Sequence, residues 1–305
     1  HIRTMEESAP YNGIGIRVTC EFEHNGKKYF GHHFNIFDTT PWKYEYFSKA
    51  IEDLKQTKFT KFTDNFIRTT ATPRTVNIYS DQEWKIVCQK FAIMSKIARE
   101  CGLKGLMFDV ECYKHPFFEP RQYLDKGYSY KEICQKMRQR GNEFSQAIFK
   151  EYPNQIFFCP FWLSIGLTHT QPGTKYALFY PFVNGVYDSL PPEATIIDGI
   201  EFNGYQANSY EDFVAMEVIS KVFIRRDEKK GRRFILSSGI SNRRKYERSA
   251  RVILYDGNVS FSNGGRRNGR INRENEGIFA DCRNDKTVSV HEQRSALVRI
   301  GTADE

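Results

Sequence analysis

Two carboxylates stand at the end of one apolar run in the first half of the chain. Residues 105–113 read GLMFDVECY, so Asp109 and Glu111 follow a run of large apolar residues. Side chains alternate between the two faces of a strand, so these two carboxylates are predicted to share one side. Neighbouring carboxylates push their pKa values apart, which keeps one of them protonated near neutral pH. The pattern predicts acid/base chemistry, whereas the simpler interpretation is a capping Asp beside an exposed Glu.

A second apolar run ends in carboxylates about ninety residues later. Residues 196–205 read IIDGIEFNGY and place Asp198 and Glu201 behind the run. Glycoside hydrolysis uses two carboxyl groups, about 5–5.5 Å apart for retention and about 6.5–9.5 Å apart for inversion. Glu201 is therefore the predicted partner of Glu111. Asp198 competes for that role or binds substrate, although Asp-Gly is also a plain turn.

Further polar and aromatic side chains are predicted to line a substrate cleft around these carboxylates. A Trp after a strand offers a flat ring on which a sugar stacks. The chain has no zinc-protease motif, nucleophile elbow, phosphate loop or dinucleotide fingerprint. We predict no metal and no cofactor, because carboxylates suffice for hydrolysis. The predicted substrate-binding residues are Asp198, Tyr113, Trp162, Tyr205, Asn35 and Asp64.

The elements that must position these residues alternate between strands and helices. The strands are short apolar runs, as expected for a parallel sheet that is buried on both faces. This rhythm predicts an α/β fold, a (β/α)8 TIM-like barrel with its active site at the carboxyl ends of the strands. Predicted strands span residues 62–68, 106–110, 155–160, 195–202 and 233–238, and predicted helices span 41–54, 81–101, 129–152, 175–187 and 209–222.

The two ends of the chain depart from this rhythm. Residues 15–23 and 29–37 read as strands joined by an Asn-Gly turn, and the latter is taken as the first barrel strand. From about residue 249 the chain is rich in Arg, Asn and Gly, with short strand-like pieces. We therefore predict a barrel with an N-terminal β-hairpin over residues 1–248. Residues 249–305 form a β-rich segment that completes the barrel or starts an accessory module.

The formal net charge of +8 comes largely from three clusters of Arg and Lys, within residues 225–233, 243–248 and 266–270. The simplest interpretation is a solvated basic surface, and the sharper one is recognition of a sulfated or uronate-bearing glycan. No RNA-recognition motif or zinc-finger spacing occurs, which disfavours nucleic acid. Aromatic residues make up 15% of the chain, which suits a glycan-binding cleft but also a large core.

Cysteine usage and the chain start bear on the compartment. The seven cysteines include no CxxC pair, and disulfides are compatible with the sequence without being required. No apolar run of about eighteen residues occurs, so no membrane span is predicted. The chain starts at His1, which indicates a removed signal peptide or a trimmed chain. We expect a secreted or periplasmic bacterial protein.

The segments GLKGLMFDVECY and SYKEICQKMRQRGNEFSQAIFKEYPNQ resemble a pattern of uncharacterised bacterial TIM-barrel proteins related to glycoside hydrolases. The segment IIDGIEFNGY is similar to their second Asp-Gly-x-Glu block. The resemblance covers roughly residues 30–240 and implies a barrel, a secreted bacterial origin, a carbohydrate substrate and roles for Asp109, Glu111 and Glu201. This chain departs at Val110 and Cys112, where Pro is more usual. Asp-x-Glu also resembles the end of the chitinase motif, but the upstream aspartates are missing.

The resulting hypothesis is hydrolysis of a glycosidic bond in a poly- or oligosaccharide. Glu111 is the general acid/base, Glu201 the nucleophile or base, and Asp109 tunes Glu111. One alternative is a non-catalytic glycan-binding barrel. Another is a polyanion-binding module that uses the Arg-rich tail and loses affinity steeply with salt.

Overall fold

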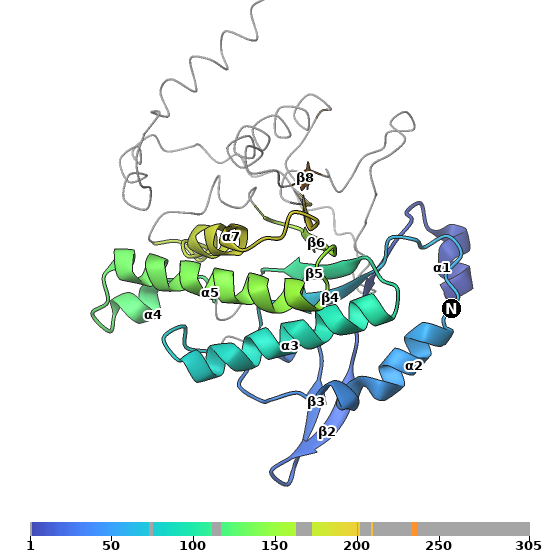
Figure 1. Ribbon diagram of the computed structural model, residues 1–305, viewed down its shortest axis with the longest axis horizontal. Helices are drawn as coiled ribbons and strands as arrows, with labels where there is room; N and C mark the ends of the chain where they lie inside the picture. Colours follow the sequence, from blue (N-terminus) through green and yellow to red (C-terminus); the bar gives the residue numbers. More distant parts are fainter. Residues whose placement is uncertain are drawn as a thin grey trace, which may run out of the picture. The chain divides into compact units, whose positions relative to one another are not determined.

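The computed structural model describes residues 2–72, 76–111, 117–162 and 173–199, together with Glu201, Ser209 and the backbone of strand β8 (Arg233–Leu236). These residues form a mixed α/β structure built on a parallel sheet, with strand order β1-β4-β5-β6-β7-β8 (Figure 1). Along the chain, each further strand of this sheet is added at the same edge, beside the strand of the sheet that precedes it. The remaining strands are β1 (Gly15–Ile16), β4 (Phe66–Thr70), β5 (Gly105–Asp109), β6 (Ile156–Cys159) and β7 (Thr195–Asp198).

Three helices lie one after another along the sheet, and neighbours in this row pack against each other (Figure 1). They are α3 (Asp81–Glu100), α5 (Tyr130–Glu151) and α7 (Phe179–Asp188), and the short α4 (Arg121–Leu124) precedes α5. The helix predicted over residues 129–152 is confirmed, and it begins with a capping box: Ser129 Oγ accepts the Glu132 N–H and the Glu132 carboxylate accepts the Ser129 N–H. The helix predicted over residues 81–101 is confirmed as well, and it ends before Gly102, whose φ of +69° lies in the left-handed region.

Two glycines bring α5 and α7 into backbone contact. A Cβ atom on Gly141 of α5 would overlap with the carbonyl of Phe182, and one on Gly185 of α7 would overlap with the carbonyl of Arg138. Neither position accepts a side chain without separating the helices. The α5–α7 crossing is therefore as close as the two backbones permit.

The two faces of the sheet have different neighbours. Alternate strand residues pack into the large core shared with the helices, among them Leu106, Phe108 and Phe157. The intervening residues form a separate apolar cluster of Phe66, Met107, Phe158 and Ile197 on the opposite face. Met107, Phe158 and Ile197 lie directly side by side in the register of β5, β6 and β7. The sheet is thus buried on both faces.

The N-terminal helix α1 (Ile2–Ser8) is held to the segment before β4 by a single carboxylate. Glu6, 5% exposed, accepts the backbone N–H groups of Thr60, Lys61 and Phe62 at 2.8–2.9 Å and the Thr60 hydroxyl at 2.5 Å. These donors, led by the Phe62 N–H, lower the pKa of Glu6 to about 2. An apolar cluster of Ala9, Tyr11, Ile14 and Phe62 packs beside this contact.

Glu6→Gln is expected to lower the melting temperature at neutral pH, because an amide cannot accept all four donors. The folded-state pKa lies below the ordinary value of 4.5, so the stabilising contribution is complete above about pH 5. It declines as the pH falls through 4.5 toward 2. Thermal unfolding of both proteins between pH 2 and 7 should show a difference that shrinks across this window. Glu7→Gln, on the exposed side of α1, is the control, and a pH-independent difference would contradict the assignment.

The predicted N-terminal hairpin is confirmed, but its strands are shorter than expected. Strands β2 (Cys20–His24) and β3 (Lys27–Gly31) pair antiparallel around Asn25 and Gly26, with φ +50° and +72°. The prediction of one strand over residues 29–37 is wrong. The chain leaves β3 at Gly31 and forms the 3₁₀ helix η1 (His33–Asn35), capped by the His32 side chain. The first strand of the parallel sheet is instead β1, which pairs with β4.

Two predicted helix starts are also wrong. The helix expected from residue 41 begins as the 3₁₀ helix η2 (Tyr44–Phe47) and continues as α2 (Ser48–Gln56). The delay has a local cause, since the Thr40 N–H donates to Asp38 Oδ1 at 2.9 Å and closes a turn. The helix expected from residue 175 begins only at Phe179, because the Leu178 N–H is taken by the carbonyl of Phe118 at 2.9 Å.

A buried ammonium group joins α3 to the segment that follows η1. The Lys90 side chain is fully buried and donates to the carbonyls of Asn35 and Asp38 at 3.1 and 2.9 Å. It also forms an ion pair with the Asp38 carboxylate and lies 4.8 Å from the ring centroid of Trp42. Burial lowers the pKa of Lys90, and Asp38 opposes this shift. Lys90 thus ties residues 35–38 to the helix layer.

Several predictions fall outside the described residues: the helix over 209–222, the three basic clusters and the segment 249–305. The cysteines within the described part of the chain, Cys20, Cys88, Cys101, Cys134 and Cys159, all carry free thiols. Of the helices described, none has both the length and the apolar character needed to cross a membrane.

Candidate functional site

The carboxyl end of β5 carries the first predicted pair of carboxylates. Asp109 ends the strand and Glu111 follows it two residues later. Asp109 Oδ2 accepts a hydrogen bond from Arg68 Nη2 of β4 at 3.0 Å, in a salt bridge whose side chains are only 14% and 17% exposed. Asp109 Oδ1 accepts the Glu111 N–H at 3.0 Å. One carboxylate thus joins the guanidinium on the neighbouring strand to the backbone of Glu111.

Arg68 is the residue of this site that the sequence prediction missed. It lies in the middle of β4, and its neighbours along the strand are apolar or Thr. In a strand that is otherwise buried, a charged residue needs a partner of opposite charge. This requirement could have indicated from sequence that Arg68 binds a carboxylate, although it does not identify the strand that carries it.

The second carboxylate-bearing strand end lies close to the first. β7 is separated from β5 only by β6, so their ends are about 10 Å apart along the sheet. Cys159, the last residue of β6, lies between them. Burial raises the pKa of the Cys159 thiol well above its usual value, and the carboxylates of Asp198, Asp109 and Glu201 add to this shift. The strand ends that carry the predicted carboxylates thus lie on either side of the end of β6. We call this edge of the sheet the carboxyl edge.

Asp198 occupies the helix-facing side of this edge. It is 3% exposed and lies in register with Cys159, whose neighbours belong to the core under the helices. Asp198 Oδ1 accepts the Trp162 N–H at 3.1 Å and so orders the turn after β6. The prediction that Asp198 contacts substrate is wrong in this geometry. Glu201 follows it at intermediate exposure, with its N–H donated to the carbonyl of Pro160 at 3.0 Å.

The Trp162 ring is a core side chain. It is 1% exposed, and its indole N–H donates to the Tyr187 hydroxyl at 2.6 Å. The rings of Phe157 and Phe179 pack edge-on against it at 5.5 and 5.4 Å between centroids. The prediction of a sugar-stacking face at Trp162 is therefore wrong, because the ring packs inward beneath α7.

Asn35 and Asp64 have local roles that the sequence prediction did not anticipate. The Asn35 amide accepts the His32 N–H at 2.8 Å and donates to the carbonyl of Phe30 at 2.5 Å, which occupies both of its ends. Asp64 precedes β4 and so lies at the amino end of the sheet, opposite to Asp109; its nearest charge is Lys104 at 3.8 Å. The hydrogen bonds of Asn35 are thus local, and Asp64 lies at the opposite end of the sheet from Asp109. Tyr113 and Tyr205 lie outside the described residues.

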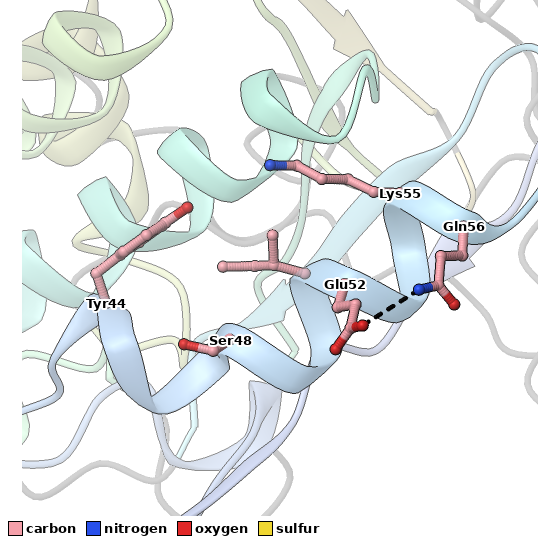
Figure 2. A pocket seen from close by; sticks show the side chains of 6 residues that line it. Tyr44, Ser48, Glu52, Lys55 and Gln56 are labelled. Atoms are coloured by element: carbon pink, nitrogen blue, oxygen red, sulfur yellow. Dashed lines mark hydrogen bonds between the residues drawn. The ribbon is translucent and has the colours of Figure 1, made fainter.

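Two surface grooves of the described residues lie elsewhere. One, of about 420 Å³, is lined by side chains of η2 and α2, among them Tyr44, Lys55 and Gln56, and Figure 2 shows these side chains. A dashed line there marks the 3.2 Å hydrogen bond from Gln56 to Glu52. A second groove includes Lys96 and Glu151. Neither contains a residue of the carboxyl edge.

Metal coordination at the carboxyl edge is not indicated by the described side chains. No group of three or more His, Cys, Asp or Glu residues among them is arranged to hold a metal ion. Comparison with protein-family models, with curated proteins and with solved structures finds no match to this chain.

Proposed function

We propose that this chain is the catalytic domain of a glycoside hydrolase built on a (β/α)8 barrel. The observation that carries the proposal is the placement of carboxylates after two strand ends on either side of β6, Asp109 with Glu111 after β5 and Glu201 after β7. Glycoside hydrolysis requires a pair of carboxyl groups, and the ends of two strands that flank a third can supply both of them. The substrate class is a poly- or oligosaccharide, and the +8 net charge favours an anionic one.

The strand order supports a barrel. Doubly wound sheets reverse their strand order, and ligands bind at the switch point. In this chain the order runs in one direction from β1 to β8, as it does around a barrel wall. The apolar cluster of Phe66, Met107, Phe158 and Ile197 lies on the face away from the helices, as interior barrel residues do. Enzymes with this fold place their active sites at the carboxyl ends of the strands.

The geometry supports distinct roles for the carboxylates. Asp109 forms a salt bridge with Arg68 through one carboxylate oxygen, and its second oxygen accepts the backbone N–H of Glu111. Asp109 is therefore a positioning residue. Glu111 protonates the glycosidic oxygen as the general acid, and Glu201, across the end of β6, acts as nucleophile or base. The chain requires no cofactor for these steps.

Product release from defined glycans tests the proposal. Oligosaccharides of a β-glucan, chitin, a pectic uronan and a sulfated galactan are incubated with the wild-type protein and with Glu111→Gln. Glu52→Gln, on the exposed side of α2, is the matched control. Release by the wild type and by Glu52→Gln but not by Glu111→Gln supports hydrolysis at this site. Binding without release from any glycan favours a non-catalytic glycan-binding barrel, and equal release by all three proteins removes Glu111 from the mechanism.

Arg68→Met is expected to lower kcat by about 100-fold, because Asp109 loses its ion pair and no longer holds Glu111 in place. Arg68→Lys keeps the charge and should recover part of the loss, although it lacks the planar guanidinium. Initial rates of both variants on the best glycan substrate check this. Equal rates for Met and Lys would show that the charge at this position is irrelevant to turnover.

A further inference from the structure

The segment between β3 and β4 exposes an aromatic surface. Phe30 and Phe34 are each 47% exposed, more than any other large hydrophobic side chain among the described residues. The imidazole of His32 lies between them, with ring centroids 5.3 Å from Phe30 and 5.8 Å from Phe34. We call Phe30, His32 and Phe34 the aromatic platform. Exposure of two phenyl rings to water is unfavourable in free energy. An exposed apolar patch on a rigid segment therefore indicates a binding surface.

The platform lies at the carboxyl end of β4. The Thr70 hydroxyl, at the end of that strand, donates to the carbonyl of His33 at 2.6 Å. The Thr72 hydroxyl donates to the carbonyl of Phe34 at 3.4 Å. Thr70 is also the register partner of Asp109 on β5. The backbone of the platform is therefore one strand away from the carboxylate that holds Glu111.

The platform is built before any ligand arrives. His32 Nδ1 accepts the Phe34 N–H at 3.0 Å, and Asn35 bridges the His32 N–H and the carbonyl of Phe30. The Lys90 ammonium group donates a hydrogen bond to the carbonyl of Asn35. Rings fixed in this way lose little conformational entropy on binding, which favours affinity.

The hydrogen bond to His32 Nδ1 also fixes the tautomer of the ring. Because Nδ1 accepts a hydrogen bond, the neutral imidazole carries its own hydrogen on Nε2. Burial lowers the pKa of His32, with Asp38 opposing and Arg17 reinforcing the shift, so the ring is neutral at pH 7. Among the described residues Nε2 has no hydrogen-bond partner. The platform thus offers two apolar ring faces and one neutral donor between them.

We propose that Phe30, His32 and Phe34 form a sugar subsite beside the carboxyl edge. The C–H face of a pyranose ring stacks on the phenyl rings, and His32 Nε2–H donates to one of its hydroxyl groups. The inference rests on the proposed function, since it assigns the position of a sugar unit next to the unit that is cleaved. A protein partner fits less well, because two phenyl rings are far smaller than a stable protein interface.

Binding without turnover separates this proposal from the proposed function. Calorimetric titration of Glu111→Gln with the four oligosaccharides named above measures affinity in the absence of cleavage. Phe34→Ala or Phe30→Ala in that background is expected to raise Kd about tenfold. Leu124→Ala, an exposed apolar residue of α4, is the control and should leave Kd unchanged. Phe34 takes part in the local hydrogen bonds only through its backbone, so its truncation is expected to leave the fold intact, which near-UV circular dichroism verifies.

The outcomes point in different directions. Weaker binding by both Phe variants supports the subsite whether or not the wild type cleaves any glycan. Unchanged Kd in both folded variants overturns the subsite and leaves hydrolysis standing if the wild type releases product. Absence of binding by all four oligosaccharides overturns the subsite, and product release by the wild type then decides the proposed function separately.

Discussion

Glu111→Gln is expected to lower kcat for glycan hydrolysis by about 100- to 10,000-fold, with a much smaller change in KM. Gln has the shape of Glu but has no proton to give to the departing oxygen, and general acid catalysis contributes a factor of this size. The Glu111 N–H bonded to Asp109 belongs to the backbone, so the substitution leaves that contact in place. Initial rates of reducing-end release from the best substrate measure the effect.

Two further measurements assign the role of Glu111. A substrate whose leaving group departs without protonation, such as a nitrophenyl glycoside, should recover much of the rate in Glu111→Gln but little in Glu201→Gln. The reason is that only the general acid becomes dispensable when the leaving group is already a stable anion. If both variants recover equally, the two roles are assigned wrongly. If Glu111→Gln keeps more than half of the wild-type kcat, Glu111 is not the acid.

Lys90→Met is expected to lower the free energy of unfolding by about 3–5 kcal/mol. Removing one member of a buried ion pair leaves the Asp38 carboxylate, which is 20% exposed, without its countercharge. The carbonyls of Asn35 and Asp38 lose a donor at the same time. Met fills a similar volume, so the loss reports the charge and its hydrogen bonds rather than a cavity. Urea unfolding at pH 7 followed by circular dichroism gives the difference directly.

Lys85→Met is the matched control, because Lys85 lies on the exposed side of the same helix. A surface substitution of this kind changes stability by about 0.5 kcal/mol or less. Equal stability of the two variants would show that the desolvation of Lys90 cancels its attraction to Asp38. A stability loss accompanied by weaker oligosaccharide binding would be consistent with Lys90 also supporting the aromatic platform.

The parts of the fold that were predictable from sequence are those with local causes. The Ser129 cap and its Glu132 partner set the start of α5, and Gly102 ends α3, with no help from distant residues. The strand over residues 106–110 was recognisable because a continuous apolar run in this setting must be buried. The strand expected over residues 29–37 failed because the His32 side chain competes for a backbone N–H and begins a 3₁₀ turn.

Of the residues at the candidate site, the sequence alone identified only the carboxylates. Alternation along a strand places Asp109 and Glu111 but does not reveal that Arg68 of another strand binds the first of them. Trp162 was misassigned because a Trp after a strand reads the same whether it points outward or beneath α7, and only the tertiary contact with Tyr187 decides. Phe30 and Phe34 resemble any other core aromatic in sequence. Phe30 lies on the exposed face of β3 and Phe34 lies in η1, and the aromatic side chain alone does not mark either position as exposed.

The close crossing of α5 and α7 restricts the substitutions that this chain can accept during evolution. α5 leads from β5 into β6, and α7 leads from β6 into β7, so the crossing at Gly141 and Gly185 sets the spacing between the connections of both carboxylate-bearing strands. One added methyl group at either glycine would wedge the helices apart and shift the carboxylates relative to each other. Selection on the arrangement of these strand ends therefore extends to two positions that carry no side chain.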